Sequence, residues 1–135
     1  MLQRAIYVSD AAGAQGSTIL SMALILGASD ANNRRDHVTG MLIYHRGQFM
    51  QVIEGARVDI DRLMKRLRAD VRHGNIRMLL DGSAHDRRFG SAPMAQVPVE
   101  GAVADILGDR MLDALSLSDA EALFTTGVIQ SGMAA

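Results

Sequence analysis

The segment TGMLIYHRGQFMQVIEG, residues 39–55, decides the fold because it carries the pattern of a β-hairpin. Two β-rich runs, residues 41–45 and 48–53, flank Arg46 and Gly47. A glycine in so short a loop supplies the positive φ that tight turns between strands need. The segment therefore predicts two neighbouring antiparallel strands.

An amide side chain stands out on the second of these strands. Alternate side chains of a strand share a face, so Gln51 is expected between Phe49 and Ile53 on a face that otherwise has the pattern of a core. A buried amide costs about 1–3 kcal/mol unless its hydrogen bonds are made. Two interpretations stay open here: the face is partly wet, or a polar group meets Gln51.

The composition fits a single domain without a nucleic-acid or membrane partner. The chain has 135 residues, a net charge of −1 and a hydrophobic content of 48%, which together allow one independent core. The sequence contains neither a basic patch nor an apolar run long enough to cross a bilayer. Its first ten residues lack a secretory pattern, so we expect a cytoplasmic protein.

Several kinds of chemistry are excluded by the residues that are missing. The chain has no cysteine, so it cannot form disulfides, thiolate metal sites or thioether links to a cofactor. Its four histidines show no metal-ligand spacing, and no Walker, G-x-G-x-x-G or G-x-S-x-G motif is present. We therefore expect no metal site.

Hydrophobic periodicity predicts the other elements of the domain. We expect strands over residues 2–9, over 76–80 and within 89–97, a polar loop over 81–88, and helices over 18–33 and 57–70. The order β-α-β-β-α-β plus one strand is the ferredoxin-like plan with a fifth strand added, an α+β fold. Both helices should then lie on one face of the sheet.

The tail supplies a cover for the other face. Residues 102–115 and 118–129 have the periodicity of two amphipathic helices, and Ser118 with Glu121 matches a capping box at the second. We expect a first domain over residues 1–98 and a helical extension over 99–135.

The predicted topology brings three polar side chains together. The strand over residues 2–9 and the second hairpin strand are the central pair of this plan, so Tyr7 and Gln51 should lie close together on the helix-covered face. Asn33 ends the first helix beside them. A phenol and two carboxamides between apolar helix walls suit a flat ligand with polar edges.

Five segments in order then indicate a family. They are L-x-R-x-I-Y-V-S (residues 2–9), N-N-R-R-x-x-V-T-G-M-L-I-Y (32–44), G-Q-F-M-Q-V-I-E-G (47–55), R-A-D-V-R-H (68–73) and R-R-F (87–89), the last followed by Met94. With these segments and gaps the sequence resembles the BLUF family, the blue-light sensors that use FAD.

The resemblance implies non-covalently bound FAD with its ring system between the two helices. It makes Tyr7 the electron donor, Gln51 the switching glutamine and Met94 the methionine of the last strand. It places Asn33 at the flavin edge and Asn32 against the ring. The remaining cofactor-binding positions that it implies are Ile25, Ser29, Arg66, Leu67, Asp70, Arg72 and His73, although ordinary core or surface roles stay open for Ile25, Leu67 and Arg66.

Two positions depart from the family pattern. Ala92, followed by Pro93, stands where the family often has tryptophan, and the chain contains no tryptophan at all. Ala56 replaces a common proline at the start of the second helix, where either residue is tolerated. Switching by exchange of tryptophan and methionine is therefore not expected in its usual form.

The resemblance implies a short photoreceptor that signals to a separate protein effector and has no catalytic turnover, because only 38 residues follow Val97. A homo-oligomer is compatible with this interpretation. Two alternatives stay open: a flavin-free ferredoxin-like interaction module, and an acylphosphatase-like hydrolase. The hydrolase would need a glycine-rich anion loop followed by arginine after the first strand, and the segment A-A-G-A-Q-G-S (residues 11–17) has glycines but no arginine.

Overall fold

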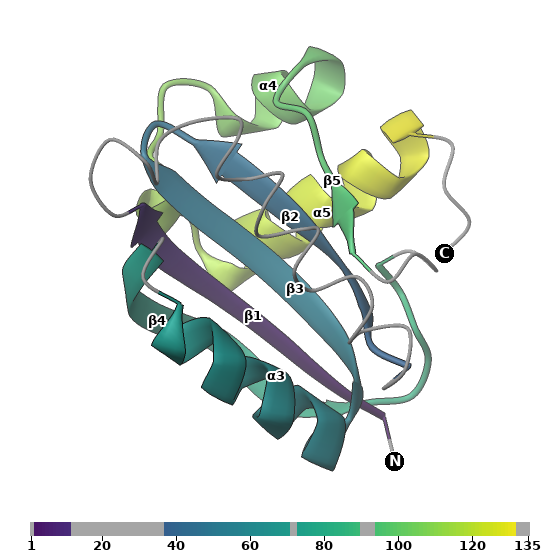
Figure 1. The fold of residues 1–135 in the computed structure, drawn as a ribbon. Coiled ribbons are helices and arrows are strands. Elements are labelled where there is room, and N and C mark those ends of the chain that lie inside the picture. The colour runs from purple at the N-terminus through teal and green to yellow at the C-terminus, as the bar shows by residue number, and fades with distance from the viewer. Residues whose placement is uncertain (1, 12–36, 71–72, 90–93, 132–135) are drawn as a thin grey trace.

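The computed structural model describes residues 2–11, 37–70, 73–89 and 94–131 and shows an α+β fold in which helices lie on both sides of one twisted sheet (Figure 1). The strands are β1 (Leu2–Ala11), β2 (Thr39–His45), β3 (Gln48–Ala56), β4 (His73–Ala84) and β5 (Ala95–Gln96). The helices are α3 (Arg57–Ala69), α4 (Gly101–Leu107) and α5 (Leu117–Ser131), with a 3-10 turn, η1 (Leu112–Ala114), before α5. The helix predicted over residues 18–33 lies outside the described residues.

The sheet has the strand order β4-β1-β3-β2-β5. Strands β1 to β4 pair antiparallel, and β5 pairs parallel to β2 at the edge. This confirms the predicted α+β sheet, with β1 and β3 as neighbours in its interior and a short fifth strand added. The β1–β3 register joins Leu2 to Ala56 at one end and Asp10 to Gln48 at the other.

The hairpin forms where the sequence predicted it. Arg46 and Gly47 are the only residues between β2 and β3, and they have φ values of 49° and 81°. Two successive positive φ values match the right-handed twist of the flanking strands, which is why glycine is favoured in such a turn. Both strands extend beyond the predicted runs.

Side-chain alternation divides the core into two layers. On the α3 face, Ala5 of β1 and Ile53 of β3 pack with the buried stripe of α3, which consists of Ile60, Leu63, Met64 and Leu67. On the opposite face, Ile6 and Val52 pack with the tail, including Val103, Leu107, Leu123 and Phe124. The tail therefore covers the sheet face away from α3, as predicted.

Two details of the predicted tail are wrong. The helix predicted over residues 102–115 ends at Leu107, because Gly108 adopts a left-handed φ of 59° and caps the helix. The capping box is formed by Ser116 and Asp119, not by Ser118 and Glu121. The Asp119 N–H donates to Ser116 Oγ at 3.1 Å, and the Ser116 N–H donates back to the carboxylate at 3.2 Å.

Strand β4 is longer than predicted, since residues 81–84 continue the pairing with β1 and are not a loop. Its pairing with β1 shifts register twice, between Ile6 and Tyr7 and between Val8 and Asp10. Such bulges increase local twist and disfavour pairing of an edge strand with another chain. No helix within the described ranges is long and apolar enough to span a membrane.

Gly40 of β2 gives a direct test of this sheet. A Cβ at this position would lie 1.9 Å from the carbonyl oxygen of Val52, a backbone atom that cannot move without breaking the β2–β3 pairing. We expect Gly40→Ala to lower the free energy of unfolding by at least about 2 kcal/mol, measured by urea denaturation.

Gly82→Ala is the matched control, because a Cβ at Gly82 on β4 meets no described atom within 4 Å. Alanine fits an extended strand better than glycine, so this variant should be neutral or slightly more stable. Equal losses in the two variants would contradict the close approach at Gly40.

Candidate functional site

The site is organised around Tyr7 and Gln51, which lie directly opposite each other in the β1–β3 register. Both side chains are 1% exposed and both point to the α3 face, as the alternation predicted. A phenol and a carboxamide thus replace core residues in the centre of the sheet. The wet-face interpretation of Gln51 is excluded, and a polar group does meet the amide.

Hydrogen bonds connect these two residues to Met94. The Tyr7 hydroxyl donates a short hydrogen bond to Gln51 Oε1, and Gln51 Nε2 donates to Met94 Sδ at 3.1 Å. The hydroxyl donates because Oε1 can only accept, and a thioether sulfur is a weak acceptor. The chain Tyr7–Gln51–Met94 therefore has a defined direction in the resting geometry.

The surroundings hold Tyr7 in its neutral form. Burial raises the pKa of the Tyr7 phenol far above its ordinary value of 10.0, and the negative charge of Asp70 raises it further. A neutral phenol keeps its proton available for donation to Gln51. Asp70, at the end of α3, is thus within electrostatic reach of the site.

His73 closes the end of the site beside Tyr7. Its Nε2 lies 2.7 Å from the Leu67 carbonyl oxygen, and its Nδ1 lies 2.7 Å from Ser9 Oγ. A carbonyl only accepts, so Nε2 carries a hydrogen and donates to Leu67, while Nδ1 is hydrogen-bonded to the Ser9 hydroxyl. The ring centroid is 6.1 Å from that of Tyr7 and 6.2 Å from that of Phe49.

The other predicted site residues divide into two groups. Leu67 is buried in the α3 core layer, Arg66 is half-buried on α3, and Met94 contacts both the α3 layer and the cluster around Phe49. The second group lies outside the described residues and comprises Ile25, Ser29, Asn32, Asn33 and Arg72, together with Ala92 and Pro93. The structure therefore brings together Tyr7, Gln51 and Met94 with His73 and Leu67 nearby.

One polar group escaped the sequence-based prediction. Glu54 is fully buried on the face opposite Gln51, and its carboxylate accepts from the Arg4 guanidinium at 2.7 and 2.8 Å. It also accepts from the backbone N–H groups of Arg88 and Phe89. The signal was visible in the sequence as a charged residue at the end of an apolar strand.

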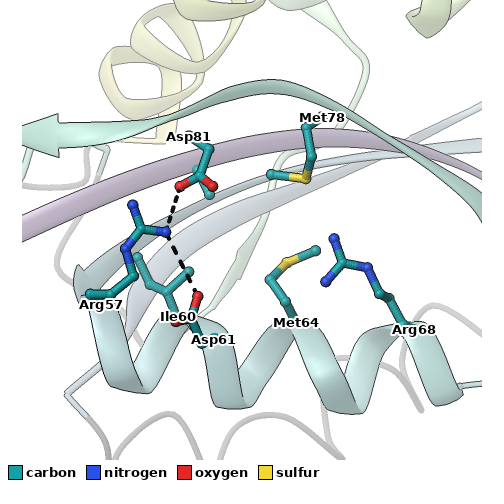
Figure 2. A pocket seen from close by; sticks show the side chains of 8 residues that line it. Arg57, Ile60, Asp61, Met64, Arg68, Met78 and Asp81 are labelled. Carbon is teal, nitrogen blue, oxygen red and sulfur yellow. Dashed lines mark hydrogen bonds and ion pairs between the residues drawn. The ribbon is translucent and has the colours of Figure 1, made fainter.

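A cleft of about 210 Å³ lies beside α3, and neither Tyr7 nor Gln51 lines it. Figure 2 shows the side chains that do. Met64 and Met78 line it from opposite walls. Arg57 at one end pairs with Asp81 at 3.0 Å and with Asp61 at 3.7 Å. Arg68 also lines the cleft, so two guanidinium groups balance two carboxylates there. The described lining contains neither an amide nor a phenol, so the cleft does not offer a flavin edge the groups that the Tyr7–Gln51 pair offers.

The Tyr7–Gln51 pair does fit such an edge. An oxidised flavin presents acceptor and donor atoms side by side on an otherwise apolar ring. Among the residues described, the Gln51 carboxamide uses one N–H toward Met94 and one lone pair toward Tyr7. A carboxamide has a second N–H and further acceptor capacity, which a polar ring edge could engage.

Comparison with known proteins agrees with this geometry. The family profile described as "BLUF: Sensors of blue-light using FAD" matches residues 2–95. The chain belongs to the BLUF family. BLUF proteins bind a flavin, as the family description states.

Relatives of this BLUF chain occur in larger proteins. It is 32% identical over 89 residues to the photoactivated adenylate cyclase subunit beta of Euglena gracilis, covering 66% of this chain but 10% of that protein. It is 35% identical over 66 residues to the blue light- and temperature-regulated antirepressor BluF of Escherichia coli (strain K12), covering 49% of this chain and 16% of that protein.

A solved structure of similar length shares the fold. It is BlsA in its photo-activated state, with a TM-score of 0.86, 22% identity and 96% of each chain covered.

The raised pKa of Tyr7 predicts that this residue contributes no tyrosinate absorbance when the folded protein is titrated to alkaline pH. Folded wild-type protein and Tyr7→Phe should show the same growth of tyrosinate absorbance up to about pH 11, because Tyr7 stays protonated. The unfolded chain loses this proton near pH 10, so the free energy of unfolding should fall above pH 10 by up to about 1.4 kcal/mol per pH unit. Tyr7→Phe should lack this part of the loss. If folded Tyr7→Phe showed less tyrosinate absorbance than folded wild type below about pH 11, Tyr7 would titrate in the folded protein and the burial argument would be wrong.

Proposed function

We propose that this chain is a blue-light photoreceptor that holds FAD non-covalently against the α3 face of the sheet. It signals to a separate protein and has no catalytic turnover of its own. The observation that carries the proposal is the buried hydrogen-bond chain from Tyr7 through Gln51 to Met94. Family membership supports the flavin, and the resemblance to FAD-using sensors supports FAD over FMN.

Two groups of residues would hold the cofactor in this proposal. On the described side, Tyr7 and Gln51 would face the polar edge of the ring, and Leu67 with the His73 ring would form the wall. His73 acts through its ring face, because both of its nitrogens are engaged by protein. By resemblance to the family, the remaining contacts come from Ile25, Ser29, Asn32, Asn33, Arg66, Asp70 and Arg72.

When bound, the flavin supplies a chromophore that becomes a strong oxidant on absorbing blue light. Tyr7 is the electron donor, and its phenolic proton leaves along the hydrogen bond to Gln51 Oε1. Return of the electron and the proton restores the phenol, so no net oxidation remains. Burial of Tyr7 favours proton transfer to Gln51, because it keeps water from competing for the phenolic proton.

Gln51 converts this transfer into a change of hydrogen bonding. Rotation or tautomerisation of its carboxamide exchanges a donor for an acceptor at each end. After rotation Met94 faces an oxygen, to which a thioether cannot donate, and the Gln51–Met94 hydrogen bond is lost. Each such bond is worth about 1 kcal/mol, enough to bias a segment between two arrangements.

The proposed output route runs from Met94 through β5 to α5. Val97 follows β5 and packs in the same core layer as α5. A Cβ on Gly127 of α5 would lie only 3.0 Å from Val97 Cγ1, so helix and strand approach closely there. Movement of β5 would therefore change the packing of α5, which lies in the helical extension that we assign to residues 99–135.

Release of the cofactor tests the proposal. The purified protein should be yellow, and heat denaturation should release all of its flavin, since the chain has no cysteine to retain it. Chromatography of the released compound should identify FAD rather than FMN. A colourless protein that cannot be loaded with flavin would instead support a flavin-free interaction module.

The roles of the central pair predict two variants without a light response. Tyr7→Phe and Gln51→Leu should keep flavin but lose the reversible red shift of its absorption after blue light, because each breaks the donor–amide chain at nearly constant packing volume. Tyr44→Phe is the control. Tyr44 is half-buried on β2 with its ring centroid 5.1 Å from that of Phe49, outside the proposed chain. A normal shift in either test variant would refute the assigned roles.

A further inference from the structure

Glu54 binds a segment that belongs to neither of its neighbouring strands. Its carboxylate, 0% exposed, accepts from the backbone N–H of Arg88 at 3.0 Å and of Phe89 at 2.9 Å. Its charge is balanced by Arg4, whose guanidinium lies 2.7 Å away and is 14% exposed in its side chain. Removing one partner of such a buried pair is costly, because the other charge is left uncompensated.

The main chain at Glu54 holds the same segment a second time. The Arg87 guanidinium donates to the Glu54 carbonyl oxygen at 2.9 Å, and also to Thr39 Oγ1 at 2.6 Å and the His37 carbonyl oxygen at 2.8 Å. Two guanidinium groups lie over the Phe89 ring, that of Arg4 at 5.2 Å and that of Arg88 at 5.1 Å from its centroid. Residues 87–89 are thus fixed to β3 and to the start of β2.

The chain reaches β3 again at Met94, whose sulfur accepts from Gln51 at 3.1 Å. Gln51 and Glu54 are three residues apart on one strand and point to opposite faces of the sheet. Phe89 and Met94 are therefore both held by β3. Phe89 is held by a charged, fully buried carboxylate, and Met94 by a weak thioether hydrogen bond.

We propose that Glu54 is a positioning residue for the light switch: by fixing residues 88–89 on β3, it sets the position from which Met94 meets the Gln51 carboxamide. The inference rests on the proposed function only in giving the Gln51–Met94 contact a role in the response. These two attachments differ in strength, so Met94 moves when Gln51 changes while Phe89 stays in place. Displacement is then directed into β5 and Val97.

Glu54→Gln tests this with little change of volume. An amide NH2 would face either Arg4 or the backbone N–H groups, and donors facing donors cannot bond. Arg88→Ala is the matched control. It removes the ion pair between Arg88 and Glu121 (3.0 Å) and the cation over Phe89, but it keeps the backbone N–H that binds Glu54.

Two measurements are made on the purified protein in the dark. In Glu54→Gln the exchange of the Val97 amide, which donates to the Leu42 carbonyl oxygen at 2.9 Å, should be about tenfold faster than in wild type. The 13C-methyl resonance of Met94 should also shift. In Arg88→Ala the Val97 rate should stay within about twofold of wild type and the Met94 resonance should not move. The Val52 amide, in the centre of β3, reports global stability in all variants.

Glu54→Asp gives the same test if Glu54→Gln does not fold, since it keeps the charge but shortens the reach toward residues 88–89. The proposal is overturned if Val97 and Met94 are unchanged in the folded Glu54 variants. It is also overturned if Arg88→Ala alters them equally, which would indicate a merely structural cluster. Neither readout needs light or flavin, so a protein without flavin would defeat the proposed function without deciding this test.

Discussion

The antiparallel pairing of β1 with β3 is the constraint on which the rest of the structure depends. Its register sets Tyr7 opposite Gln51, and alternation then sends both side chains to the α3 face. A slip of one residue would send one partner to the opposite face and separate the phenol from the carboxamide. The chemistry of the site is therefore fixed by backbone pairing before any side chain is oriented.

That register is specified by the apolar side chains on both faces. Ile6 and Val52 are buried under the tail, whereas Ala5 and Ile53 are buried under α3, so both faces of the two strands carry core residues. A slip of β3 by one residue would exchange its side chains between the two layers, so it would bury Gln51 among the apolar residues under the tail and disturb the packing of both layers. The tail is thus needed for the site, although it contacts the opposite face.

Local patterns predicted much of this arrangement. Alternation around Gln51 and the glycine of the hairpin turn are properties of short segments, and the structure reproduces both. The capping box was misplaced because Ser116 and Ser118 each have an acidic residue three positions later, so the motif alone does not choose between them. Packing of Leu117 against the core layer favours the earlier start.

Other features could not be predicted because they depend on distant partners. The extent of β4 is set by its pairing with β1, and the role of Glu54 by a segment more than thirty residues away. The flavin contacts assigned by resemblance could not be predicted from local patterns or from pairing within the chain, because they require a ligand. A buried amide shows that a partner is needed, without showing which partner it is.

Gln51 and Glu54, two of the buried polar residues of β3, illustrate how one strand can combine stability with the switch that we propose at Gln51. Glu54 is saturated by a guanidinium and two backbone N–H groups, so no rearrangement of its carboxylate improves its hydrogen bonding. Gln51 is a neutral amide with a strong acceptor contact on one side and a weak sulfur contact on the other. Only a group whose two orientations differ little in free energy can be driven between them by a single hydrogen bond. The switch proposed at residue 51 requires this of its amide, and a carboxylate there could not supply it, because a carboxylate offers acceptors at both ends.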